Sequence, residues 1–402
     1  MQRARIFTAG PAFSARVGSR AIAEALLAGL FVGLCAAAAW VILAFPKPAV
    51  FDQARLLAAR FEAPFHPSPP YGFTAQLAVI AIKAVVPAAG PALHEWVRLL
   101  AMLCYAGAAA ALAARLLASR ALVAAFLVFL FASLYPLLWL STELVAGCFL
   151  CLALLAWSAG WPHAATGALL ALLALCKPEL GLVSAALLAV WLPRCASRSE
   201  SYALAGSFAG TLALLLLPGV LLAGPAYLVR YGGGERGFAS FAQHFAALVA
   251  PLQLAEGAPN PWLEPRPYLD FVALSVAKGV RKAGFVASWA ALAVPVLVVS
   301  RRRTGVRLDD PERAMLATFI GVLPFVLLSY PHIRYFARYY PLFLLLLLRS
   351  VERVGEAAPA RLRALMLAPA GLCLAAALAT LAARASATLG AVARLEPFWF
   401  SD

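Results

Sequence analysis

The sequence contains little charge and none of the common nucleotide-binding motifs. Only 13% of its 402 residues are charged while 64% are hydrophobic, and a soluble domain of this size cannot bury so much apolar side chain. The chain has no G-x-x-x-x-G-K-[S/T] motif and no G-x-G-x-x-G that follows a strand. It also shows no internal repeat of about 20 to 50 residues, the signature of a solenoid. These absences exclude nucleotide-dependent soluble enzymes and repeat proteins.

Cysteine and histidine are scarce as well. Most of the seven cysteines lie inside apolar runs, where they pack as small hydrophobic residues, and they provide no disulfide framework. Cys148 and Cys151 have C-x-x-C spacing, but they lie in the middle of an apolar run with no second pair or histidine nearby. The five histidines have no metal-ligand spacing, so we expect no structural zinc site.

The sequence does contain a series of apolar runs separated by short connections. Their lengths predict an all-α polytopic membrane protein, a bundle of about 11 transmembrane helices forming one domain over residues 1–402. Lys and Arg fall mostly in the connections, which predicts a cytoplasmic N-terminus and explains the net charge of +15 through membrane lipids without any nucleic acid. The Ala-, Leu- and Arg-rich composition indicates a GC-rich bacterial genome, and hence a bacterial inner (plasma) membrane.

Two connections, both expected on the outer side, are longer than the others. The first, residues 46–92, predicts two short amphipathic helices, Asp52–Glu62 and about Tyr71–Val86, that lie in the interface plane. The second, residues 226–283, is the most polar segment, and we expect it to bind an acceptor substrate. We expect no separate soluble domain.

Within the membrane, the apolar stretch from Ala164 to Val190 is interrupted by Lys177-Pro178-Glu179. Pro178 breaks a helix, and two charged residues flank it, so we predict two short helices that meet at the outer face.

Charged residues of four separated segments fall on this outer side. Isolated charges cost roughly 2.5–3.5 kcal/mol each at the bilayer centre and less near its edge, so we expect these residues to be paired or to share one polar cavity. The segments contain Asp52 with His66, then Glu143, then Lys177 with Glu179, and last His332, Arg334, Tyr335 and Arg338. An outer-face site without a nucleotide motif favours a lipid-borne substrate.

If that substrate is a sugar linked to a polyprenyl phosphate, the chemistry needs a base and several cations. A carboxylate must take the proton from the acceptor hydroxyl, a role that suits Asp52. Cations must stabilise the departing phosphate, and Lys177, Arg334 and Arg338, with His332 beside them, suit that role.

The order of these segments resembles the GT-C superfamily of integral-membrane glycosyltransferases, and the resemblance covers most of the chain. It is carried by Asp52 to Ala59 and the Pro-Pro stretch after it, Tyr135-Pro136, Ser141-Thr142-Glu143, Leu175 to Leu182, and Arg334-Tyr335 before Tyr340-Pro341-Leu342. The resemblance implies a GT-C-like bundle that uses a polyprenyl-phosphate sugar as donor and a lipid or glycan as acceptor.

The resemblance also implies roles for individual residues. Asp52 becomes the catalytic base, Glu143 helps to position substrate or a metal, and Lys177 lies near the lipid phosphate. Gln53 stands where many members carry a second acidic residue, and Glu143 where Asp is common, so a bound divalent metal is not supported. The absence of a soluble outer domain disfavours an oligosaccharyltransferase that acts on proteins.

Each candidate residue also has a structural interpretation. Asp52 is a suitable helix N-cap, and Glu143 falls in a first helical turn, which favours an acid. Lys177 can extend to the lipid headgroups. His66 suits an exposed loop and His244 the interface; we nevertheless keep both, with Glu179, as candidates for binding substrate. Arg334, Tyr335 and Arg338 also fit a basic and aromatic interfacial belt.

The sequence therefore predicts an inverting hexosyl or pentosyl transferase with its active site on the outer face. The alternative is a transporter or flippase for a lipid-linked saccharide, which would also need a cationic cavity. Alternating access favours internal repeats and charges near the midplane, and the sequence shows neither.

Overall fold

The computed structural model describes residues 11–44, 73–86, 91–132, 142–177, 180–225, 227–228, 284–328 and 338–393. Within these ranges every regular element is a helix, which confirms the all-α class. The elements are α1 (Pro11–Ala44), α3 (Phe73–Val85), α4 (Pro91–Leu116), α5 (Arg120–Ala132), α6 (Thr142–Ala159), α7 (His163–Ala174), α8 (Leu180–Trp191), η2 (Leu192–Arg194), α9 (Arg198–Ala223), α13 (Gly284–Thr304), α14 (Asp310–Leu328), α15 (Tyr340–Ala357) and α16 (Ala360–Ala393).

Several of these helices have the length and composition of membrane spans. Among the described residues, three segments are long and apolar enough to cross a bilayer, namely Ala21–Trp40, Ala92–Leu116 and Arg198–Ala223. Shorter apolar helices accompany them, including α5, α6, α7 and α8. By these criteria the chain is a helical membrane protein, whereas the expected number of about 11 spans stays a prediction.

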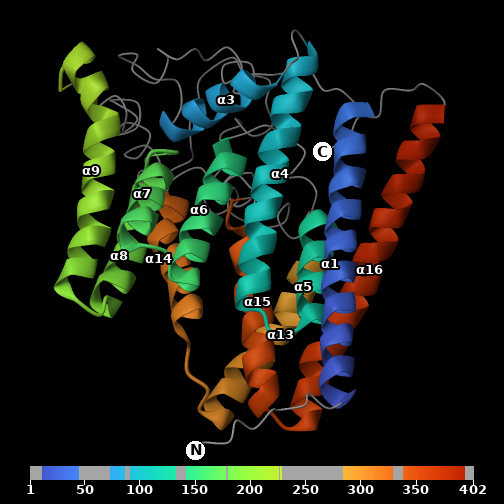
Figure 1. Cartoon of the computed structure of the whole chain (residues 1–402). Coiled ribbons are helices and arrows are strands. Elements are labelled where there is room, and N and C mark those ends of the chain that lie inside the picture. Colours follow the sequence, from blue (N-terminus) through green and yellow to red (C-terminus); the bar gives the residue numbers. More distant parts are fainter. Residues whose placement is uncertain are drawn as a thin grey trace, which may run out of the picture.

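The long helices run side by side along one direction, and α3 runs across them near one end of the bundle (Figure 1). This arrangement agrees with the expectation of a short helix in the interface plane between about Tyr71 and Val86. The first four residues of α3 are all buried, and the backbone N–H of Thr74 donates to the carbonyl of Leu175 at 3.2 Å. This hydrogen bond therefore connects the start of α3 to the residue that follows α7.

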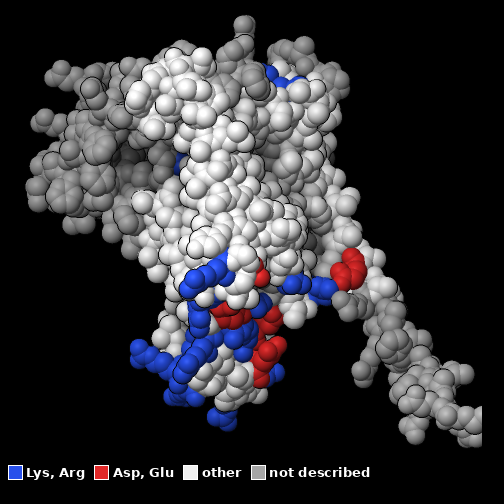
Figure 2. Space-filling model, turned by 60° about the vertical axis from the view of Figure 1, so that its left-hand side comes forward, with Lys and Arg blue, Asp and Glu red and all other residues white. Residues whose placement is uncertain are grey.

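Charged residues gather at the other end of the molecule, whereas the body above it is largely without charge (Figure 2). We call this the basic end, because it contains Arg194, the run Arg301 to Arg303, Arg349 and Arg353. Its ion pairs join α13, α14 and α15 around the fully buried carboxylate of Glu312. The separation of a charged end from an apolar body is what a membrane protein requires.

We call one group of residues at the basic end the Glu312 network. It consists of Arg301, Asp309, Glu312, Arg349, Ser350 and Arg353. Arg353 Nη1 lies 2.6 Å from Glu312 Oε2, and Arg349 Nη2 lies 2.6 Å from Asp309 Oδ2.

One predicted boundary agrees with the structure and another does not. The break at Lys177-Pro178-Glu179 is confirmed as the interval between α7 and α8, which have 12 residues each. The first apolar run alone indicates a helix from about Ala21 to Phe45, whereas α1 begins ten residues earlier, at Pro11.

The shortness of α7 and α8 determines where they meet. At 1.5 Å per residue, each is only about 18 Å long, whereas the hydrocarbon core of a bilayer is about 30 Å thick. The neighbouring α9, with 26 residues, is long enough to cross it. By length, neither α7 nor α8 crosses that core alone, which agrees with two short helices, and their meeting at the outer face stays a prediction.

Candidate functional site

Three of the predicted site residues come together at the ends of three helices. Glu143 lies in the first turn of α6, Lys177 follows α7, and Arg338 immediately precedes α15. The Lys177 ammonium contacts Oε1 of Glu143, and Nη1 of Arg338 lies 2.9 Å from Oε2 of the same carboxylate. We call these residues the Glu143 triad.

The Glu143 triad carries a net positive charge in a buried setting. The side chain of Glu143 is 4% exposed and that of Arg338 is 0% exposed, whereas Lys177 retains 19%. Two cations therefore contact one carboxylate in a largely buried setting. Charged donors of this kind also form strong hydrogen bonds with phosphate and carboxylate groups.

Local structure fixes the three side chains. The amide of Leu180 donates to the carbonyl of Lys177 at 3.0 Å and so starts α8 directly after the break. Glu143 lies at the positive end of the α6 macrodipole, which stabilises its carboxylate. Arg338 lies in a single 3₁₀ turn that precedes α15, and Pro341 occupies the first turn of that helix.

Gly147, one turn after Glu143, lets two other elements approach α6. A Cβ at this position would overlap the ring of Tyr105 and lie 3.3 Å from Cα of Arg338. Tyr105 itself is fully buried. Neither Gly147 nor Tyr105 was predicted as part of the site. The signal for Gly147 is its i, i+4 spacing from Glu143, which puts the two residues on one helix face.

Aromatic residues next to Arg338 face the protein and are not a free interfacial belt. The guanidinium carbon of Arg338 lies 5.0 Å from the centre of the Tyr339 ring, and Tyr339 is 3% exposed. The hydroxyl of Tyr340 lies 3.5 Å from the carbonyl oxygen of Phe129 on α5. These contacts fix the start of α15 against α5, as a site on that turn requires.

A second buried polar cluster was not foreseen by the sequence analysis. His94, Glu95 and Arg98 lie in the first turns of α4, and all three are at most 5% exposed. Arg98 pairs with Glu95 and donates to the carbonyl of Ile42 at 3.0 Å, which connects α4 to the end of α1. The signal that could have found it is the presence of three ionisable residues at the start of an apolar run.

The remaining predicted site residues lie outside the described part of the chain. They are Asp52, His66, Glu179, His244, His332, Arg334 and Tyr335. Their proposed roles, and the expected helix Asp52–Glu62, therefore stay predictions. The proposed loops 46–92 and 226–283 are also largely outside the described residues.

Within the described residues, the one group of three potential metal ligands lies away from the Glu143 triad. It consists of His163, Cys195 and Glu200, around the starts of α7 and α9. Glu143 offers a single carboxylate that two cations already contact.

Comparison with known proteins gives no family. No protein-family model matches the chain, and no curated protein sequence matches it. Similar solved structures include an oligosaccharyltransferase from Archaeoglobus fulgidus in its apo form, aligned over 87% of this chain and 56% of that one, at 12% identity and a TM-score of 0.49.

Two further structures of that archaeal enzyme give the same picture. One is its complex with Zn and sulfate, with 87% and 52% of the two chains aligned, and the other is tethered to an acceptor peptide, with 88% and 55% aligned. Both have 12% identity and a TM-score of 0.48. The chain thus spans just over half of the archaeal protein's length, and a likeness at this level carries no argument about what this chain does.

Proposed function

We propose that this protein is a GT-C-type membrane glycosyltransferase that moves a sugar from a polyprenyl-phosphate donor to a lipid or glycan acceptor, with inversion at the anomeric carbon. The observation that supports it best is the Glu143 triad, in which one buried carboxylate holds two cations at the ends of three helices. The proposal also rests on the ordered sequence resemblance, which contains Glu143 and Lys177.

In the proposed reaction, Lys177 binds the donor phosphate directly. It is the one member of the Glu143 triad with appreciable exposure, and its ammonium can exchange part of its contact with Glu143 for a phosphate oxygen. Arg338 has no exposed surface and acts through Glu143, which it helps to position. His332, Arg334 and Tyr335 complete the phosphate site in this proposal.

The chemical step is a single displacement. Asp52 takes the proton of the acceptor hydroxyl, and the resulting oxygen attacks the anomeric carbon on the face opposite to the phosphate. The bond between that carbon and the phosphate oxygen breaks, and its electrons leave with the polyprenyl phosphate. The positive charge of Lys177 and its neighbours stabilises the leaving group, which therefore needs no proton.

The proposed setting is the outer face of a bacterial inner membrane, with the N-terminus in the cytoplasm. The basic end then faces the cytoplasm, as the positive-inside rule requires, and α3 lies at the outer side above the Glu143 triad. Within this proposal, His66, Glu179 and His244 contact substrate, and the segment 226–283 selects the acceptor. A lipid-linked donor can reach a recessed site laterally from the bilayer.

The test uses purified protein in liposomes with a radiolabelled polyprenyl-phosphate hexose or pentose and a bacterial envelope lipid extract as the source of acceptor. We expect release of polyprenyl phosphate, its loss in Asp52→Asn, and a rise of roughly tenfold or more in the donor KM for Lys177→Met. Asp310→Asn, at the basic end, is the control and should behave like wild type.

Two results would overturn the proposal. One is near-full activity of a folded Asp52→Asn variant. The other is passage of the intact labelled donor across the bilayer with no release of polyprenyl phosphate, which would identify a flippase.

A further inference from the structure

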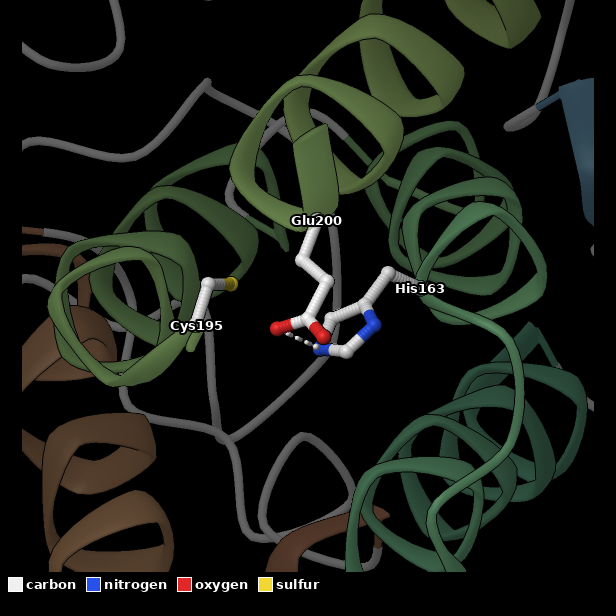
Figure 3. Close-up of side chains that lie close together, drawn as sticks. All are labelled: His163, Cys195 and Glu200. Carbon is white, nitrogen blue, oxygen red and sulfur yellow. Dashed lines mark ion pairs between the residues drawn. The ribbon is translucent and has the colours of Figure 1, made fainter. Parts of the chain in front are cut away.

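Three potential metal ligands converge at the basic end, around the starts of α7 and α9. His163 is the first residue of α7, Cys195 follows η2, and Glu200 lies in the first turn of α9. Their ligand atoms all lie within 4.8 Å of one another, and His163 Nε2 is 3.9 Å from Glu200 Oε2. Figure 3 shows the Glu200 carboxylate lying between the Cys195 sulfur and the His163 ring.

The position of Glu200 has a structural explanation that leaves the other two residues unexplained. Ser197 Oγ accepts from the amide of Glu200 at 3.3 Å, and Glu200 Oε2 accepts from the amide of Ala196 at 2.7 Å. This arrangement caps α9 and directs the carboxylate back toward Cys195. Helix capping gives no reason for an imidazole and a thiol to face the same carboxylate, but it does fix the carboxylate in advance of a ligand.

Local contacts position the imidazole and the thiol. The rings of Trp157 and Trp191 are parallel, with centres 4.8 Å apart, and His163 packs edge-on against Trp157 at 5.6 Å. The Cys195 thiol lies 3.7 Å from the backbone carbonyl oxygen of Trp191. The stacked pair thus connects the His163 ring to the end of the helix that precedes Cys195, which restricts the separation of the two ligands before any ion binds.

We propose that His163, Cys195 and Glu200 bind one divalent metal ion of the zinc type. Imidazole nitrogen, thiolate sulfur and carboxylate oxygen are the ligands that Zn²⁺ takes, and a thiolate with a carboxylate offsets its two positive charges. Tetrahedral coordination with bonds of about 2.0 Å to nitrogen and 2.3 Å to sulfur puts the ligand atoms about 3.5 Å apart, so side-chain movements of about 1 Å complete the site. Binding releases the Cys195 proton to solvent, and water fills the fourth position.

The ion would join two helices that already pack tightly. Ser207 Oγ on α9 donates to the carbonyl of Ala164 at 2.6 Å, and a Cβ on Gly167 would overlap the carbonyl oxygen of Leu204. His163 and Glu200 lie at the basic-end termini of the same two helices. The metal therefore acts as a structural clamp, and it lies at the opposite end of α7 from the Glu143 triad.

The test is Co²⁺ and Zn²⁺ binding by the purified full-length protein in detergent, after stripping with a chelator. We expect one Co²⁺ per chain with the charge-transfer absorption of a thiolate–cobalt bond, displaced by Zn²⁺. Cys195→Ser should abolish this absorption, and His163→Gln and Glu200→Gln should each weaken binding by roughly tenfold or more. Glutamine at position 200 still caps α9, so that variant separates metal binding from folding.

A second measurement follows the thiol itself. Zn²⁺ should slow the alkylation of Cys195, located by mass spectrometry, and should slow it much less in Glu200→Gln. Cys104→Ser is the matched control and should bind Co²⁺ like wild type. Co²⁺ binding that is absent from wild type, or equal in wild type and Cys195→Ser, would overturn the proposal. Neither result depends on the transferase activity proposed above.

Discussion

The Glu143 triad and the Glu312 network both place arginine against a buried carboxylate, but they satisfy that carboxylate differently. Glu312 Oε1 accepts from Ser350 at 2.8 Å and contacts Arg301, and its Oε2 accepts from Arg353 at 2.6 Å and from the amide of Asp309 at 3.0 Å. Two guanidinium groups therefore compensate the charge of Glu312, and a hydroxyl and a backbone amide also donate hydrogen bonds to it.

In the Glu143 triad one carboxylate likewise contacts two cations, but its arginine is more deeply buried. Arg338 has no exposed surface, whereas the arginines that contact Glu312 keep 17% and 29% of theirs. The Glu312 network joins α13, α14 and α15 at the basic end. In the Glu143 triad Lys177 keeps 19% of its surface, so its ammonium can meet an incoming anion.

The most severe test of this difference is Glu143→Gln. It removes the buried negative charge that contacts Lys177 and Arg338, so both ion pairs are lost, and we expect a loss of about 3–5 kcal/mol in the free energy of unfolding and the loss of sugar transfer. Thermal unfolding in detergent and the release of polyprenyl phosphate measure the two effects. Glu356→Gln, on the exposed face of α15, is the control. A stable and fully active Glu143→Gln variant would contradict the comparison.

Glu312→Gln tests the other side of the comparison. We expect a comparable loss of about 3–5 kcal/mol in stability, because the substitution removes one buried charge from contact with two arginines. Activity per folded molecule should stay near that of wild type, measured at a temperature where the variant is folded. A selective fall in the transfer rate at unchanged stability would show that the Glu312 network takes part in the function.

Gly147→Ala should disturb the Glu143 triad without changing any charge. Its Cβ would overlap the Tyr105 ring and press on the backbone of Arg338, so we expect a loss of about 1–3 kcal/mol in stability and a lower transfer rate. The matched control is Gly107→Ala on α4, where an added Cβ meets nothing within 4 Å. Identical unfolding temperatures for the two variants would rule out the close packing around Gly147.

The smallest effect is expected for Arg194→Gln. The ion pair of Arg194 with Asp310, at 2.9 Å, joins partly exposed side chains at the basic end. Exposed pairs contribute between roughly 0 and 1 kcal/mol, so the unfolding temperature should change little and transfer should be unaffected. If Arg194→Gln lowered the unfolding temperature as much as Glu312→Gln, the partly exposed pair of Arg194 and Asp310 would stabilise the fold as strongly as the buried Glu312 network.

The sequence was informative wherever the cost of burying charge left few arrangements. Glu143, Lys177 and Arg338 were expected to share one site for that reason, and the structure brings the three together. Pro178 likewise predicted the break between α7 and α8, because proline removes a helix hydrogen bond. The prediction that the chain is a helical membrane protein followed from the length of its apolar runs.

Details that depend on distant partners could not be predicted. No local pattern shows that the Arg301 guanidinium reaches Glu312, because the two residues lie on different helices. The approach of Tyr105 to Gly147 depends on how α4 crosses α6, which the sequence does not specify. His163 and Cys195 are far apart in the chain, so their proximity gave no recognisable spacing.

The hydrogen bond between the amide of Thr74 and the carbonyl of Leu175 has a consequence for biosynthesis. The ribosome completes α3 well before α7, so the acceptor for this amide does not yet exist when α3 emerges. Until α7 and Leu175 have been made, α3 must stay in the headgroup region, where lipid and water can form hydrogen bonds with its first amides. Assembly of this end of the bundle therefore finishes only after the α7–α8 pair has entered the membrane.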